Sequence, residues 1–531
     1  MSKHRGVISC RKGMLYDTPM TRTHSSRPAA HWFVGDGLVF DRLGSRYHTP
    51  TGRPRECSAR LMIHNPQRRT ARVTARFYHP DRPPTELALE VGGGQIAGVE
   101  LAELPQVPHN QSFWIEVLSD VPVFPQVRHE DYTFWDPVPD AMVSPTPYPG
   151  PLRDERSWVH PDCYQGGAAS WFEQEVLTIL NPGERPVKAR IRYLLRSFDG
   201  AGEETIEIPG HRIAQINVWE RAPRLIGGKS APYVQVVGDY AVRIDADGPV
   251  ISHATRRARW RGFEPVIGSR GSIGVPLRKR HPRIWYYPGG LFRRRPQLPE
   301  GEGRQPWARS DIGWNLLFTH NVDEIRPARA TLRFHGPDGR HSEAVLEVPP
   351  LKSDLQWLFH EPWIGRHTRI GEPFAMVIES DDPVVPEVTN AEFEPWSQVC
   401  PGAMSSVNFF PAPLKHQRRW WLGIGRAGAA ADGPVEWEQN WHIFNPGRRE
   451  AKIRLWFAGL ENERTLEHRL AVPAGAVAML SSRDIDGLPA GMDFAAFADS
   501  DVPVCCQTFA FTFTRGLPYV RGMYGFMGVA V

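Results

Sequence analysis

Residues 173–194 read EQEVLTILNPGERPVKARIRYL, and residues 437–457 read WEQNWHIFNPGRREAKIRLWF. In both stretches an apolar run leads into Asn-Pro-Gly, and a segment of alternating polar and apolar residues follows. Alternation with a period of two is typical of a β-strand that buries one face, and Asn-Pro starts a turn. The same strand–turn–strand unit therefore occurs in two distant parts of the chain.

Four short markers indicate that this unit occurs four times in the 531 residues. In order, they are a Trp five residues before a Gly, a strand that ends in Asn, a Pro-Val step after an acidic turn, and a small apolar closing segment. The asparagines are Asn65, Asn181, Asn321 and Asn445, and the prolines are Pro122, Pro249, Pro383 and Pro503. In the second unit, Cys163 stands where the first marker expects Gly.

A repeat of about 120–130 residues has the size of a domain, unlike the short repeats of solenoid proteins. Each unit can therefore bury a core of its own, and we expect four domains in tandem. The predicted bounds are 1–28 for a polar tail, then 29–150, 151–280, 281–415 and 416–531 for the first to the fourth unit.

The composition favours strands over helices. The chain holds 48 Gly and 50 Pro, which long helices do not tolerate but tight turns between strands do. Hydrophobic residues make up 41% of the chain, which is enough for buried cores and excludes global disorder. We therefore predict an all-β fold of four tandem antiparallel β-sandwiches, jelly-roll-like in form. The aromatic residue nine positions before each marker proline is predicted to lie in the core: Phe113, Tyr240, Phe374 and Phe494.

Charge, cysteine content and motifs narrow the class of protein. Lys plus Arg (63) and Asp plus Glu (59) give a net charge of +4, which predicts neither an acidic nor a strongly basic partner. We interpret the six cysteines, with Cys505 and Cys506 adjacent, as reduced thiols of a cytoplasmic protein. The sequence has no apolar run long enough to span a membrane, no leader-like start, and no Walker, G-x-S-x-G, H-E-x-x-H or C-x-x-C motif. No cofactor is predicted.

The second unit resembles the sensory rhodopsin transducers, a family of small bacterial proteins. The resemblance rests on Glu175, Ile179, Leu180 and Asn181, on Ile191 and Tyr193, on Ile208, Pro209 and Arg212, and on Pro249, Val250 and Arg256. The first unit matches through ARFYHPDRPP and SDVPVFPQVRHED, and the fourth through IFNPG and LAVPAG, whereas the third is more divergent. The resemblance implies a β-sandwich reminiscent of carbohydrate-binding proteins and a cyclic tetramer. Four units in one chain would then form a monomeric pseudo-tetramer with pseudo-fourfold symmetry.

The first candidate site is a polar residue four positions after each marker proline. In the four units it is Gln126, His253, Glu387 and Gln507, within strands that are mostly apolar on both sides. A buried polar group needs a hydrogen-bond partner or a ligand, so these side chains either line a pocket between domains or bond within a core. Our hypothesis is one shared pocket, formed by His253, Glu387, Arg128 and Arg256. Two ligand types without a third do not predict a metal site.

Paired glutamates are the second candidate site. Glu173 and Glu175 in the second unit, and Glu436 and Glu438 in the fourth, are two residues apart and so share one face of a strand. A Trp stands nearby in each unit. Carboxylates beside aromatic rings suit sugar recognition, and paired carboxylates can also hydrolyse glycosidic bonds. The alternative is a pair of solvated residues on an edge strand.

Clustered arginines are the third candidate site. They surround Trp260 in RRARWR (256–261) and continue in the linker as Arg278, Lys279, Arg280 and Arg283. Such charges protect a strand edge or bind phosphate or sulfate. Nucleic acid is the least favoured partner.

Two main hypotheses for function follow. The first is a binding or scaffold protein that recognises a carbohydrate-like or polyol ligand, or a partner protein, at an inter-domain pocket. The second is a hydrolase or lyase that acts on carbohydrate or a related polyol with help from carboxylates or a metal. Divergence at the Gln/His/Glu/Gln position favours one specialised site over four equal ones, and both hypotheses accommodate it. No catalytic residue can be named.

Overall fold

The computed structural model describes most of the chain. The described residues are 30–39, 56–109, 111–132, 138–139, 141–167, 171–196, 201–218, 220–221, 229–231, 234–236, 238–260, 266–278, 281–294, 312–360, 363–393, 401–414, 416–460, 465–517 and 519–531. The predicted polar tail at 1–28 lies outside them, as do Lys279 and Arg280 of the basic linker.

The described chain is built almost entirely from antiparallel strands, which confirms the predicted all-β fold. In the first unit, an outer sheet of order β4-β3-β6-β1-β9 packs against an inner sheet of order β5-β2-β7-β8. The strands are β1 (His31–Leu38), β2 (Glu56–His64), β3 (Ala71–Tyr78), β4 (Thr85–Val91), β5 (Ile96–Glu100), β6 (Ser112–Ser119), β7 (Phe124–Tyr132), β8 (Ala141–Val143) and β9 (Tyr148–Pro149).

The third and fourth units repeat this arrangement strand for strand. Their outer sheets have the orders β24-β23-β26-β21-β29 and β33-β32-β35-β30-β38, and their inner sheets β25-β22-β27-β28 and β34-β31-β36-β37. The third unit comprises β21 (Ile284–Leu291), β22 (Trp314–Asn321), β23 (Ala328–His335), β24 (His341–Val348), β25 (Ser353–Trp357), the single turn α2 (Trp363–Arg366), β26 (Pro373–Ser380), β27 (Val384–Phe393), β28 (Pro401–Asn408) and β29 (Phe410–Pro411). The fourth comprises β30 (Arg419–Arg426), β31 (Val435–Phe444), β32 (Ala451–Ala458), β33 (Leu466–Val472), β34 (Val477–Ser481), β35 (Asp493–Ser500), β36 (Cys505–Thr514), β37 (Val520–Met527) and β38 (Val529–Ala530).

In the second unit the two sheets join into one, because the end of its first strand pairs with the inner sheet at Gly166 and Gly167. The joined order is β13-β12-β17-β10-β11-β18-β19, with β14 beside β11 and β20 beside β10. The strands are β10 (Ser157–Gly167), β11 (Trp171–Asn181), β12 (Val187–Leu195), β13 (Ala201–Ile208), β14 (Arg212–Asn217), β15 (Lys229–Ala231), β16 (Val234–Val236), β17 (Gly238–Ala246), β18 (Ile251–Trp260), β19 (Val266–Ile273) and β20 (Val275–Pro276).

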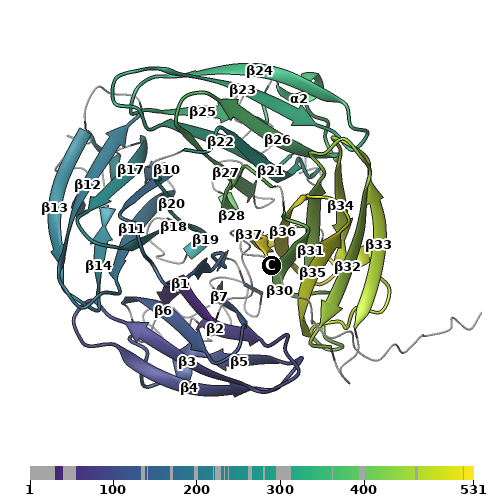
Figure 1. Ribbon diagram of the computed structural model, residues 1–531, viewed down its shortest axis with the longest axis horizontal. Helices are drawn as coiled ribbons and strands as arrows, with labels where there is room; N and C mark the ends of the chain where they lie inside the picture. The colour runs from purple at the N-terminus through teal and green to yellow at the C-terminus, as the bar shows by residue number, and fades with distance from the viewer. Residues whose placement is uncertain are drawn as a thin grey trace, which may run out of the picture.

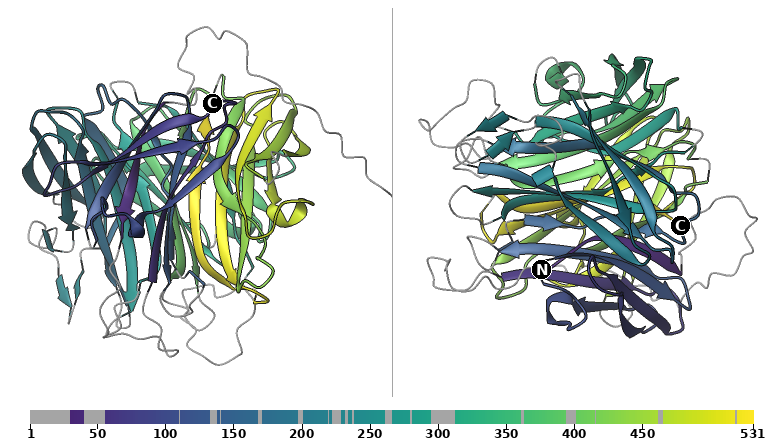
Figure 2. Two further views of the ribbon diagram at one scale, coloured as in Figure 1. Left: turned by 90° about the horizontal axis from the view of Figure 1, so that it is seen from below. Right: turned by 90° about the vertical axis from the view of Figure 1, so that its left-hand side faces the viewer.

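The four units form a ring, with the inner sheets toward its centre (Figure 1). The closing strands β8, β19, β28 and β37 contact one another there. Many strands run along the ring axis (Figure 2). Small residues permit this close approach, since a Cβ on Gly525 of β37 would come within 2.3 Å of the Val407 side chain on β28. The repeated strand order agrees with the four sequence units, and their exact bounds as domains stay a prediction.

The marker asparagines close the same turn in every unit. Asn65 donates from Nδ2 to the carbonyl oxygens of Arg69 and Val91 at 2.8 and 2.9 Å, and its Oδ1 accepts from the Gln67 backbone at 3.0 Å. The other three asparagines make the corresponding contacts, at Asn181, Asn321 and Asn445. One buried side chain thus satisfies three backbone groups that the turn leaves unpaired. The four markers therefore occupy equivalent positions.

The predicted core aromatics are all buried. In the first unit Phe113 lies opposite Gly37 on the neighbouring strand, and a Cβ on that glycine would come within 2.3 Å of the ring. The third unit repeats this with Phe374 and Gly290. The first marker therefore needs Gly because the aromatic ring fills the space of its side chain. No helix in the described ranges is long and apolar enough to cross a membrane.

Candidate functional site

The four polar residues after the marker prolines lie at the four contacts between neighbouring units. Gln126 of the first unit accepts a hydrogen bond from the backbone N–H of Ile424 in the fourth at 2.5 Å, and donates to Ser144 at 2.8 Å. Ile424 borders an irregularity in the pairing of β30 with β35. Equivalent irregularities interrupt the first strand of the other three units. Gln126 therefore joins the first and last units of the ring.

His253 and Gln507 occupy the matching contacts between the first and second units and between the third and fourth. A Cβ on Gly35 of β1 would come within 2.9 Å of the His253 ring, and one on Gly289 of β21 within 2.6 Å of Gln507. His253 is 1% exposed, and burial lowers its pKa to about 3, so the ring is neutral. Its Nδ1 is 3.0 Å from the Thr255 hydroxyl. Both side chains therefore pack against the backbone of the neighbouring unit.

Glu387 occupies the contact between the second and third units, and its surroundings differ from those of the other three. It is 1% exposed, is hydrogen-bonded to Ser272, and lies near Asp162 in the irregular part of β10. Its Oε1 has no hydrogen-bond partner among the described residues. Burial, with the Asp162 charge, raises the pKa of Glu387 well above its usual range. Both effects favour the protonated, uncharged form of the Glu387 carboxyl group.

Asp162 is the centre of a buried ionic network at the same contact. It accepts hydrogen bonds from Arg270 at 2.9 Å and from Arg256 at 3.3 Å, and it also contacts Thr389 of the third unit. Arg256 Nε lies 2.7 Å from a Glu173 oxygen. Burial raises the pKa of both carboxyl groups, while Arg256 acts in the opposite direction. The contact with the third unit is made through Thr389, which both Asp162 and Arg270 contact.

Glu175 extends this network into the sandwich of the second unit. The Tyr240 hydroxyl donates to it, and Cys163 lies beside it. Burial raises the pKa of Glu175 to about 7, against the attraction of Arg256. The sandwich of the second unit therefore contains ionisable groups at positions where core residues are expected.

The second unit alone has this combination of residues. Counted from the marker asparagine, Glu175 corresponds to Ala59, Asn315 and Gln439 in the other units. Counted from the marker proline, Arg256 corresponds to His129, Asn390 and Ala510. On the closing strands, the residue opposite this position is Arg270 in the second unit. It is Val143, Ser405 and Tyr524 in the first, third and fourth units. Counted from the marker Trp, Asp162 corresponds to Asp36, Gly289 and Ile424, so an acid at this position also occurs in the first unit. The combination of Glu175, Arg256 and Arg270 is specific to the second unit and is not required by the shared fold.

A cavity of about 590 Å³ lies at one end of the closing strands, and all four units line it. Its wall contains Ile273, Asn408 and Met527, which are the cross-strand partners of His253, Glu387 and Gln507. In the first unit, the register of β7 with β8 continues to Thr146, which also lines the cavity. The predicted polar residues are thus one strand behind the wall. We call this space the axial cavity.

At four equivalent positions of the axial cavity wall, one from each unit, polar and apolar residues alternate around the ring. Thr146 and Asn408 come from units on opposite sides of the ring, and Ile273 and Met527 come from the other two (Figure 1). Asn408 donates from Nδ2 to the Ile273 carbonyl at 2.8 Å, and its Oδ1 has no partner in the described part of the chain. A buried amide oxygen without a partner is suited to accept a hydrogen bond from a ligand.

Two serines connect the cavity wall to the ionic network. Ser272 is hydrogen-bonded to Glu387, and the Ser406 hydroxyl is 3.0 Å from that of Thr389, which contacts Asp162. Both serines line the axial cavity. The second–third contact therefore supplies two hydroxyl groups of the cavity wall.

The remaining predicted residues lie at other contacts. Arg128 is 3.4 Å from Asp493 of the fourth unit and lies over the Trp437 ring at 4.9 Å. Glu438 pairs with Arg293 of the third unit and with Arg483, both at 3.1 Å, and Glu436 pairs with Arg483 at 2.9 Å. Arg128 is therefore placed with the first–fourth contact, whereas Arg256 belongs to the ionic network.

The two glutamate pairs are one residue out of register with each other. Glu173 and Glu175 lie eight and six residues before Asn181, whereas Glu436 and Glu438 lie nine and seven before Asn445. A shift of one residue turns a side chain to the other face of a strand. The first pair accordingly faces the sandwich interior, and Glu438 faces the neighbouring unit.

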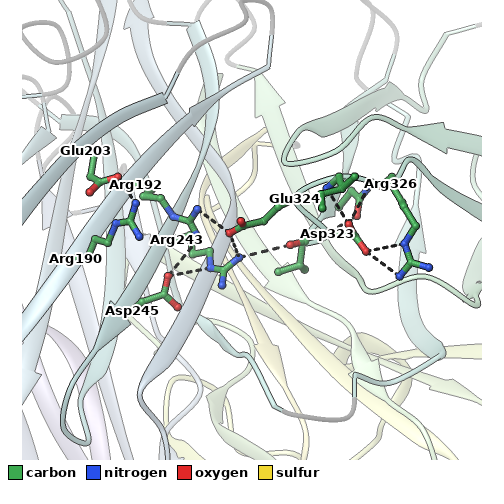
Figure 3. Close-up of polar contacts among 11 residues, drawn as sticks. Arg190, Arg192, Glu203, Arg243, Asp245, Asp323, Glu324 and Arg326 are labelled. Atoms are coloured by element: carbon green, nitrogen blue, oxygen red, sulfur yellow. Dashed lines mark hydrogen bonds and ion pairs between the residues drawn. The ribbon is translucent and has the colours of Figure 1, made fainter.

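A second, partly exposed group of ion pairs also links the second unit to the third. Arg192 and Arg243 of the second unit approach Glu324 of the third at 2.9 and 3.7 Å, and both also pair with Asp245 (Figure 3). The Glu324 side chain is 56% exposed. The same contact thus has a buried ionic network and a solvated one.

Sequence reasoning missed Asp162, Arg270 and Asn408. Asp162 falls inside the first marker, which is defined only by its Trp and Gly positions. Arg270 and Asn408 lie on closing strands that were interpreted as apolar packing. A comparison of the four units by position would not single out Asp162, because Asp36 stands at the equivalent position of the first unit. Within the described ranges, no group of three or more His, Cys, Asp or Glu side chains could hold a metal ion.

Comparison with known proteins gives weak structural similarity. No family model and no curated protein matches the chain. The solved structure of Thermotoga maritima 1070 shares 23% identity over 20% of this chain and 82% of its own, with a TM-score of 0.17. The Anabaena sensory rhodopsin transducer shares 19% over 19% and 86%, with a TM-score of 0.16. A family 32 glycoside hydrolase from Bifidobacterium adolescentis shares 9% over 94% and 96%, with a TM-score of 0.14. At these TM-scores the similarities carry no argument about function.

Proposed function

We propose that the chain is a binding protein for a small carbohydrate-like or polyol molecule, which it holds in the axial cavity. The alternation of polar and apolar residues around this cavity carries the proposal. A sugar or polyol has hydroxyl groups along its edges and apolar C–H faces. Thr146 and Asn408 match the hydroxyls, and Ile273 and Met527 match the faces. The volume of about 590 Å³ is in the range of small-molecule sites.

The polar side of the axial cavity supports hydroxyl recognition. Asn408 offers an acceptor in Oδ1, and Ser272 and Ser406 offer hydroxyls that can donate or accept. The ionic network behind both serines fixes their positions. Preorganised polar groups bind more tightly than mobile ones because less conformational entropy is lost.

The arrangement supports binding better than hydrolysis. The pair considered for hydrolysis, Glu173 and Glu175, is engaged by Arg256 and Tyr240 inside the second unit. No Asp or Glu is among the described residues that line the axial cavity. A glycosidase needs two carboxyl groups that reach the scissile bond.

The proposal is tested by isothermal titration calorimetry with sorbitol, glucose and inositol. Ser406→Ala should weaken binding by about 5–10-fold, the value of one hydrogen bond. Ser405→Ala is the matched control, because this neighbour on β28 does not line the axial cavity. Asn408→Ile, which copies the residue of the second unit, should weaken binding at least as much. Failure of every probe to bind, or equal binding by Asn408→Ile, would contradict the proposal.

We also infer that the protein acts as a monomeric pseudo-tetramer in the cytoplasm. Closure of the ring within one chain supports this, because Met527 donates its N–H to Thr146 at 2.9 Å across the first–fourth contact. The free and buried thiols of Cys163, Cys505 and Cys506 fit a reducing compartment. Light scattering after size exclusion should give a mass near the 60.0 kDa of one chain. A mass of two or four chains would contradict the monomer.

A further inference from the structure

We infer that the ligand of the axial cavity carries an anionic group, which basic side chains of the second linker bind. This inference rests on the proposed function of the same cavity. Among the described residues that line it, Arg278, His281 and Arg283 are basic, and none is acidic. The clustered arginines of the sequence analysis have two alternative roles, protection of a strand edge and anion binding. Two of them, Arg278 and Arg283, lie on the cavity wall. This location supports anion binding for the linker arginines.

Both arginines have donors to offer. Arg278 is exposed and hydrogen-bonded to Tyr148, whose hydroxyl also reaches Glu155 at 3.3 Å. Arg283 pairs with Asp381 at 3.0 Å, with side chains that are 74% and 91% exposed. Such a pair is weak, because water surrounds both charges. A guanidinium has five N–H donors, so a ligand can bind beside these partners or replace the weaker one.

The opposite side of the axial cavity does not repel an anion. Glu387 lies behind Ser272, and burial raises its pKa well above its usual range, which favours its uncharged form. Asp162 is matched by Arg256 and Arg270. The cavity therefore has a neutral hydrogen-bonding wall and a cationic one. A polyol with a single anionic end complements both.

The geometry of arginine specifies the anion only as a carboxylate or a phosphate. Its planar fork binds two oxygens of either group at once. A sugar acid and a polyol phosphate are therefore both sources of the required chemistry. Direct comparison of probes with the same carbon chain separates them.

The test compares sorbitol, gluconate and sorbitol 6-phosphate by titration calorimetry. We expect one of the two anions to bind at least about tenfold more tightly than sorbitol in about 20 mM NaCl, with a smaller advantage in about 500 mM. Arg278→Gln with Arg283→Gln should remove this advantage and retain sorbitol binding. Arg340→Gln is the control, because this arginine also pairs with an exposed acid, Asp338, but does not line the axial cavity.

Each result separates this inference from the proposed function. If sorbitol binds as tightly as both anions, the inference is overturned and the proposed function stands. If no probe binds, both are overturned. If the double variant keeps the full preference for an anion, the linker arginines do not bind it and the inference is also overturned. Unchanged thermal unfolding of the double variant confirms that any loss is local.

Discussion

Cys163 lies directly opposite Tyr240 on the neighbouring strand, where every other unit pairs a glycine with a phenylalanine. The Tyr240 hydroxyl donates to the buried Glu175. A phenylalanine could not make this bond. The pair that departs from the shared pattern therefore belongs to the unit that contains the ionic network, and the two departures are physically connected.

Tyr240→Phe should lower the free energy of unfolding by about 1–3 kcal/mol, because it leaves a buried carboxyl group without its donor. The double variant Tyr240→Phe with Glu175→Ala copies Phe113 and Ala59 of the first unit and should recover part of the loss. Urea midpoints measure both changes. Equal midpoints for wild type and Tyr240→Phe would show that the bond contributes nothing.

The contribution of Glu175 to the stability of the protein should fall as the pH rises from about 4.5 to about 7. Burial raises the pKa of this group from 4.5 to about 7. The folded state therefore holds a proton that the unfolded state releases over this range, and the difference amounts to at most about 3 kcal/mol. Above the folded pKa the loss is complete. Glu175→Gln should remove this contribution, so the difference in urea midpoint between the variant and the wild type should change between these two pH values.

Glu347→Gln is the matched control for this pH dependence, because Glu347 lies on the exposed face of β24. Its profile should follow that of the wild type. If Glu175→Gln and wild type give parallel profiles, the Glu175 carboxyl is not protonated in the folded protein at neutral pH.

Much of the fold could be predicted because its determinants are local and repeated. Asn65 and its equivalents bond to the turn that follows them, and Phe113 packs on the glycine opposite. The turn contact recurs in all four units and the glycine–phenylalanine pair in three, so their spacing alone identifies them. The joined sheet of the second unit could not be predicted, because it depends on the length of β10 and the pairing of Gly166 with Glu173.

The candidate site was only partly predictable. Glu175, Arg256 and Glu387 were named from the sequence, and the structure brings them near Asp162. These residues can be recognised from the sequence, because a charged residue in an apolar strand is unusual. The axial cavity could not be predicted, because its wall combines single residues, such as Asn408, from four units. That combination depends on how the units pack, which the period of a strand does not encode.

Phe494→Ala should lower the free energy of unfolding by about 3–5 kcal/mol. The Phe494 side chain is fully buried and packs against Trp441 and Phe457, so its removal leaves a cavity in the fourth unit. Leu517→Ala is the control, since Leu517 is 51% exposed and should change stability by no more than about 0.5 kcal/mol. Denaturant midpoints compare the two. Similar effects would mean that Phe494 is not a core residue.

Two carboxylates of the second–third contact should differ sharply in their contribution to stability. Asp162→Asn leaves Arg256 and Arg270 buried beside a neutral group and should cost about 3–5 kcal/mol. Glu324→Gln removes a side chain that is 56% exposed and should cost less than about 1 kcal/mol (Figure 3). The effect of Glu324→Gln should also vanish in high salt, whereas that of Asp162→Asn should persist. Urea unfolding at low and high salt measures both, and an Asp162→Asn effect as small and salt-sensitive as that of Glu324→Gln would refute a structural role for the buried network.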